Sequence, residues 1–156
     1  MFFKRKKKSA DITGKVQLKP LNYPPKILLG WAEAIAGNTD LRDWFLASPH
    51  FKELGMSVYA IHLKDEARDW LIQNGYAHLM AMINGVEGNA EALHWLEKNN
   101  FQILKHLALA GDGKEESYKW LIANNHNEFA LVAQKIQHVK DEIEENHNDV
   151  HKFGMD

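Results

Sequence analysis

The sequence predicts an all-α protein, a short α-solenoid of antiparallel helix pairs with a 25-residue repeat and an extended N-terminal arm. The main observation is a Trp-Leu pair that recurs every 25 residues, starting at Trp70, Trp95 and Trp120. A related Trp44-Phe45 pair precedes the first of these by 26 residues, and apolar residues recur nine and twelve residues after each of the three later Trp residues. Self-similarity at a fixed short period indicates a repeat architecture, in which nearly equivalent units stack on one another.

Residues 1–23 are predicted to form a basic arm, and residues 24–152 a single helical-repeat domain. Charge dominates the arm, prolines punctuate it, and no helical spacing of apolar residues is visible there. Pro25 is expected to begin the first helix, because proline is well tolerated in the first turn. Apolar residues at helical spacing then continue to Ile35, and Gly37-Asn38 is expected to end that helix.

Each repeat unit is predicted to consist of two short antiparallel helices. In the unit that begins at Asn89, apolar spacing predicts one helix over about residues 90–98 and a second over about 101–110. The turn between them is expected to use the left-handed backbone that Asn tolerates, which would explain Asn74, Asn99 and Asn124. Helices of two to three turns are not stable alone, so stability should come from stacking.

The final helix is expected to be longer, over about residues 127–149, with an apolar first part and a charged second part that caps the array. Trp44, Trp70, Trp95 and Trp120 are interpreted as core-facing wedges between units. Trp31 falls outside the repeat register and is therefore the candidate exposed aromatic.

The stretch Ala110–Asn125 resembles the helical part of a degenerate ankyrin repeat, where a small residue and Gly precede a helix that ends at an Asn or Gly. Ankyrin units run about 33 residues and carry a Thr-Pro-Leu-His signature, which is absent here, while HEAT-like units run about 40 residues. The resemblance covers about residues 39–136 and is one of architecture. It implies bare helix pairs and transfers no functional residue.

Composition limits the class of protein. Of 156 residues, 45% are hydrophobic and 26% are charged, which fits one globular domain. The chain has no Cys, which excludes disulfides and thiolate chemistry and fits a cytoplasmic location. No apolar run approaches the roughly 20 residues that span a bilayer, and charge follows Met1-Phe2-Phe3 where a signal peptide would be apolar.

Recognised catalytic motifs are absent from the sequence, so we expect a non-catalytic protein without a cofactor or small-molecule substrate. Glu87 and Asp112 occupy equivalent turns between units and offer two carboxylates for a cation or for acid–base work. Acidic residues before a helix are also favoured by the helix dipole alone, which is the preferred interpretation.

The best histidine pair for a metal site lies near the C-terminus. His147 and His151 are spaced i, i+4, and Glu144 precedes them by one turn, so three ligand types would share one helix face. The segment is terminal and polar, which argues against a preorganised site, and no metal is expected.

The predicted function is a protein–protein interaction module that binds a peptide or protein partner, because helical arrays present extended surfaces for recognition. The alternative is a peripheral protein that binds nucleic acid or a membrane surface through its arm. Residues 1–20 hold seven basic side chains against one acidic, a net +6, so the remainder carries −8 to reach the total of −2. A solvated tail is the preferred interpretation of the run itself, and contact with an acidic protein face is a further alternative. The candidate electrostatic residues are Lys4, Arg5, Lys6, Lys7 and Lys8.

Overall fold

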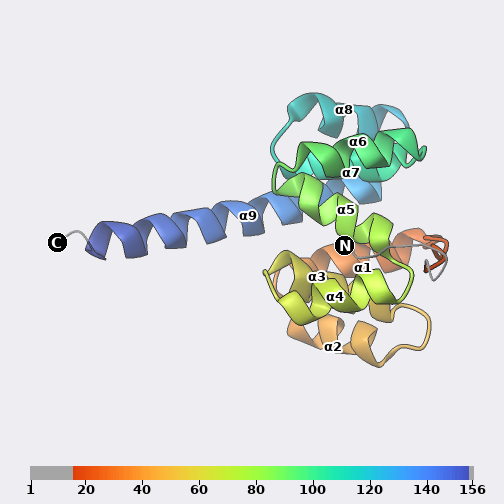
Figure 1. Ribbon diagram of the computed structural model, residues 1–156, viewed down its shortest axis with the longest axis horizontal. Coiled ribbons are helices and arrows are strands. Elements are labelled where there is room, and N and C mark those ends of the chain that lie inside the picture. The colour runs from red at the N-terminus through yellow and green to blue at the C-terminus, as the bar shows by residue number, and fades with distance from the viewer. Residues whose placement is uncertain (1–15, 155–156) are drawn as a thin grey trace.

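The computed structural model describes the backbone of residues 16–154 and the side chains of residues 16–146. Within that range the chain folds into nine helices and no strand (Figure 1). The helices are α1 Pro25–Ile35, α2 Thr39–Ala47, α3 Lys52–Ile61, α4 Asp65–Gln73, α5 Ala77–Val86, α6 Ala90–Lys98, α7 Gln102–Gly111, α8 Glu115–Ala123 and α9 Asn127–Gly154. The all-α prediction is confirmed, and Pro25 begins α1 as expected.

The helices form an inner and an outer layer. The odd-numbered helices pack in the order α1, α3, α5, α7 and α9, and α9 also packs extensively against α1. Each intervening even-numbered helix packs outside, against the two inner helices that flank it in sequence. In an open array each unit contacts only its neighbours. Here the first and last helices meet, so the inner layer closes on itself.

The closure has a physical cause in the apolar faces of the two terminal helices. Both α1 and α9 bury a continuous apolar stripe, which includes Trp31 and Ile35 in α1 and Val132 and Ile136 in α9. Neither stripe could be covered by an adjacent unit on its open side. Packing the two helices together removes both faces from water.

Trp31 is therefore not the exposed aromatic that the repeat register suggested. Its side chain is 1% exposed, and its indole N–H donates a hydrogen bond to the Ser57 hydroxyl at 2.8 Å. The prediction was wrong because α1 belongs to the inner layer, where a helix contacts neighbours on several sides.

The wedge interpretation of the repeated Trp residues also needs correction. The residue after each Trp is fully buried, whereas Trp44 is 53% exposed and the other three are only half-buried. Adjacent positions on a helix point about 100° apart, so both side chains of a pair cannot face the core. The buried partners are Phe45, Leu71, Leu96 and Leu121.

The turns inside the helix pairs use left-handed backbone one residue later than predicted. Positive φ angles occur at Gly75 (95°), Asn100 (65°) and Asn125 (65°). The preceding Asn of each turn instead donates its side-chain amide to a Trp carbonyl of the helix it ends, at 2.8 Å in each case. This bond satisfies a carbonyl that the helix C-terminus leaves free. The residues involved are Asn74, Asn99 and Asn124.

The last helix is longer than the predicted span of 127–149. It begins at Asn127 as expected but runs to Gly154, and its C-terminal half leaves the body of the molecule (Figure 1). None of the helices in the described part of the chain has both the length and the apolar character needed to cross a membrane.

Candidate functional site at the arm face

The described part of the N-terminal arm has no regular secondary structure and packs against the N-terminal ends of the inner helices (Figure 1). We call this surface the arm face; it comprises residues 16–24 and the first turns of α3, α5, α7 and α9. The Lys19 N–H donates to the Gly75 carbonyl at 2.9 Å, and His78 Nε2 donates to the Lys19 carbonyl at 2.8 Å. These two bonds fix the backbone of the arm at Lys19.

The side chains that hold the arm occupy equivalent positions in successive helix pairs. Glu53 lies in the first turn of α3 and accepts a 2.6 Å hydrogen bond from the Tyr23 hydroxyl. His78 follows 25 residues later, at the same place in α5. Further steps of 25 lead to Ile103 and Glu128, both half-buried. One helix position therefore repeats along the whole arm face.

Burial determines the protonation of these groups. The pKa of Tyr23 is raised far above its usual value, first by burial and then by the hydrogen bond to Glu53. Burial also raises the pKa of Tyr76, with a further contribution from the Glu53 charge. Burial lowers the pKa of His78. The tyrosines and the histidine are accordingly neutral at pH 7, and the Tyr23 hydroxyl keeps the proton that it donates to Glu53.

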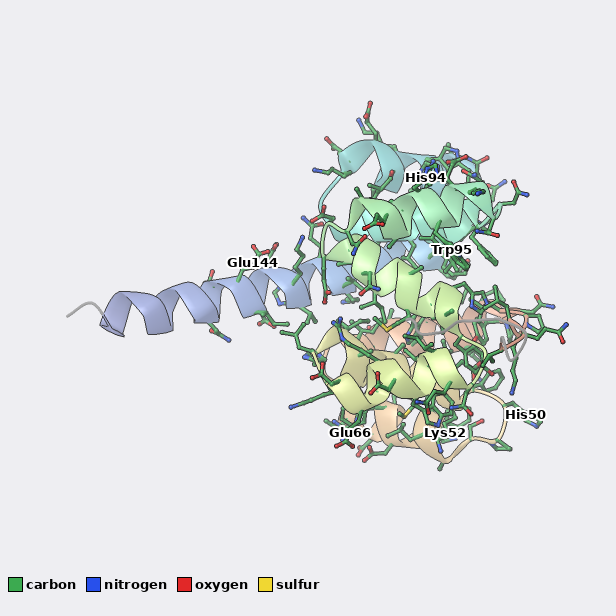
Figure 2. All side chains as sticks on the ribbon, viewed as in Figure 1. His50, Lys52, Glu66, His94, Trp95 and Glu144 are labelled. Carbon is green, nitrogen blue, oxygen red and sulfur yellow. The ribbon has the colours of Figure 1, made fainter. Side chains whose placement is uncertain are left out.

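Four aromatic pairs line the edge of the arm face. Each repeated Trp stacks on the aromatic ring that opens the next inner helix, with interplanar angles between 7° and 27°. Figure 2 shows Trp95, His50 and Lys52 on the side that carries the arm, and Glu66 and Glu144 on the opposite side. The four pairs are Trp44–Phe51, Trp70–Tyr76, Trp95–Phe101 and Trp120–His126.

A pocket of about 420 Å³ opens beside the arm. The arm forms one wall and the first turn of α7 forms another, while α5 contributes two side chains and α1 and α9 contribute one each. Its lining is mainly apolar and includes the rings of Tyr23, Trp31, Phe101 and Phe129, together with His78. Small-molecule sites have volumes of about 300–1,000 Å³ and mainly apolar walls with a few polar groups.

The two carboxylates singled out in the sequence do not share a site. Arg68 contacts both carboxylate oxygens of Glu87, at 2.5 and 3.2 Å. Asp112 instead accepts from Lys140, which also donates to the Val86 carbonyl at 3.0 Å. Each carboxylate is paired with its own cation. The first pair links α4 to the end of α5, and the second links the end of α7 to α9.

The remaining predicted sites are described only in part. The basic run at residues 4–8 lies outside the described residues, and so do the side chains of His147 and His151. Glu144 is exposed on the part of α9 that leaves the body (Figure 2). Among the residues whose side chains are described, no three His, Asp or Glu side chains gather in a way that could hold a metal ion.

Sequence reasoning missed the residues that organise the arm face. His78 lies within the apolar run Ala77–Ile83, and Glu53 lies 25 residues before it. Polar residues at three of the four equivalent positions, Glu53, His78 and Glu128, were the available signal. The role of Gly75 had no such signal, because it depends on contact with a segment more than 50 residues away.

Comparisons with protein-family models, with curated proteins and with solved structures found no match to this chain.

Proposed function

We propose that the protein is a non-catalytic interaction module, a short array of equivalent helix pairs, that binds an extended peptide segment of a partner protein along the arm face. The observation that supports this proposal is the arm itself. A segment without helix or strand already occupies part of this surface through backbone hydrogen bonds at Lys19 and apolar contacts at Leu21 and Tyr23. The same chemistry suits a peptide from another protein.

The rest of the arm face offers the same features beyond the end of the arm. Gly75, Asn100 and Asn125 are equivalent turn residues, each with positive φ. The carbonyl of Gly75 accepts from the arm, whereas those of Asn100 and Asn125 accept no hydrogen bond from the described residues. An extended peptide can donate to them with its backbone, and its apolar side chains can cover the half-exposed rings of Trp95 and Trp120.

The proposal is tested by selecting binders from a random-peptide library with the full-length protein, followed by amide exchange on the complexes. We expect protection at the first turns of α7 and α9. A matched pair of variants locates the site. Ile103→Glu places on α7 the residue that α3 and α9 carry at the equivalent position, so the fold should tolerate it. Ile122→Glu is the control: it makes the same substitution on the outer helix α8, at a position about 200° around that helix from Trp120.

We expect Ile103→Glu to weaken the selected peptides at least about tenfold, because a charge replaces apolar contact area, and Ile122→Glu to change affinity less than about twofold. Equal effects of the two variants, or protection confined to the outer helices, would contradict the proposal.

A second candidate function is electrostatic attachment to nucleic acid or to an anionic membrane through the basic arm. Its support is the charge separation in the sequence, together with two cations that continue it on the arm face. Lys19 Nζ lies 5.8 Å from the Tyr76 ring centre, and Lys52 Nζ lies 5.4 Å from that of Trp70. This function predicts binding that weakens steeply with salt and is lost when residues 1–8 are deleted.

A further inference from the structure

A carboxylate recurs at the C-terminal ends of two inner helices. Glu87 is the C-cap residue of α5, and both of its oxygens are bound by Arg68, which lies four residues after the N-cap of α4. Asp112 is the C-cap residue of α7 and is paired with Lys140. At both places a cation from another helix neutralises the carboxylate.

The preceding helix pair, α2 and α3, has the cation without the carboxylate. Arg42 lies four residues after the N-cap of α2 and is the counterpart of Arg68. His62 is the C-cap residue of α3 and is the counterpart of Glu87. The Arg42 side chain pairs instead with the exposed carboxylate of its sequence neighbour Asp43, at 3.0 Å. The place that a carboxylate fills in one helix pair therefore holds an imidazole in the other.

A pocket of about 420 Å³ opens at this place, and Arg42, His62 and Lys64 line it. The Arg42 guanidinium lies at the pocket wall, because its Cζ is 4.9 Å from the ring centre of Tyr59, which lines the same pocket. His62 and Lys64 are exposed, and a Cβ atom added at Gly37, another lining residue, would meet nothing within 4 Å. None of the acidic residues in the described part of the chain lines the pocket. A ligand that enters from solvent can therefore reach the basic groups.

Two of these basic groups act on the third. Partial burial is the first cause of the lowered pKa of His62, and the charges of Lys64 and Arg42 lower that pKa further. A hydrogen bond with the Ile35 carbonyl and the charge of Glu142 act in the opposite direction. The two cations thus lie close to one ring, where an anion would be attracted by both.

We propose that this pocket binds a phosphate monoester, whose phosphate group is held by Arg42 and Lys64 in the place that corresponds to the Glu87 carboxylate. A guanidinium binds two oxygens of a carboxylate or a phosphate at once, as Arg68 binds Glu87. Two cations match the double charge that a phosphate monoester approaches at pH 7. The pair with Asp43 is no obstacle, since an exposed ion pair contributes little stability and can be exchanged for a phosphate.

The test titrates phenyl phosphate into the natural protein and into two variants, with binding measured by calorimetry. His62→Glu supplies the carboxylate that α5 and α7 have at this C-cap, so Arg42 becomes paired within the protein, and we expect the affinity to fall at least about tenfold. His94→Glu is the matched control. It makes the same change on α6, at the other end of the molecule from α2 (Figure 1, Figure 2), and should alter the affinity less than about twofold.

A second measurement uses the natural protein alone. The pKa of His62, followed by NMR, should rise when phenyl phosphate is added, because a neighbouring anion favours the protonated ring, while the pKa of His94 should stay unchanged. The proposal is overturned if phenyl phosphate shows no saturable binding, or if the pKa of His62 does not move. It is also overturned if His62→Glu keeps the natural affinity, because the phosphate would then bind elsewhere, such as at the basic run of residues 4–8.

The source of the phosphate group is decided by the tripeptide Gly-phosphoserine-Gly in the same titration. Tighter binding than that of phenyl phosphate assigns the site to a phosphorylated partner protein, and equal or weaker binding assigns it to a small phosphorylated molecule. The pocket lies at the C-terminal ends of α1 and α3, whereas the arm face lies at N-terminal ends of the inner helices. The two proposals therefore stand or fall separately, and peptide binding on the arm face is decided by Ile103→Glu.

Discussion

Docking of the arm depends on the absence of a side chain at Gly75. A Cβ atom built there would lie 2.8 Å from the Gln17 carbonyl oxygen and 3.0 Å from Lys19 Cγ. Because one of these atoms belongs to the backbone, Gly75→Ala can be accommodated only if the arm moves away. Gly88 provides the control. Its φ of 92° matches the 95° of Gly75, but nothing lies within 4 Å of an added Cβ.

The magnitude follows from the two contributions. A non-glycine residue in the left-handed region costs about 1–2 kcal/mol, which both variants share. Gly75→Ala additionally loses the two backbone hydrogen bonds of Lys19, each with a net value of about 0.5–1.5 kcal/mol. We therefore expect urea unfolding to show Gly75→Ala less stable than Gly88→Ala by about 1–3 kcal/mol.

Amide exchange at Lys19 separates this explanation from general destabilisation. The amide should exchange much faster in Gly75→Ala under native conditions and should stay protected in Gly88→Ala. If the two variants lose equal stability and Lys19 remains protected in both, the close approach of the arm to this turn does not hold it in place.

Three further predictions concern the core, an ion pair and pH. Trp31→Ala should lower the free energy of unfolding by about 3–5 kcal/mol, and Trp44→Ala should lower it by about 1 kcal/mol, because only Trp31 is a fully buried ring. Similar losses for the two variants in urea unfolding would refute this prediction. Arg68→Ala should cost about 1–3 kcal/mol in the same assay, since it removes the charged hydrogen bonds to Glu87 and to the Ala60 carbonyl, which keeps only the Leu63 N–H as donor; a neutral effect would show that these bonds contribute little. Burial lowers the pKa of His78 and His106 below the unfolded value of 6.5, so below that pH the unfolded chain binds protons that the folded protein excludes. The stability that these two histidines contribute is complete above about pH 6.5 and is lost as the pH falls through their lower pKa values in the folded protein. A double variant with Phe at both positions should therefore give a flatter profile of urea midpoint against pH.

The local pattern of the chain determined the helices. Spacing of apolar residues predicted a helix over 90–98, which matches α6, and a final helix from residue 127, where α9 begins. Pro25 marked the first helical residue. These features depend on neighbours within a few positions, such as the i, i+3 and i+4 contacts of a helix, so they can be recognised in the sequence alone.

The arm face was decided by tertiary structure. Whether Trp31 is buried or exposed depends on the packing of α1 against α3 and α9, which lie far from it in the chain. The Trp-Leu pairs show the same limit, because the register identifies a special position but the direction of the core decides which member is buried. The arm, which returns across α5, forms one wall of the pocket and supplies the hydrogen-bond partner of His78 Nε2. Local sequence determines backbone conformation within each helix, whereas burial, protonation and the site depend on contacts between residues far apart in the chain.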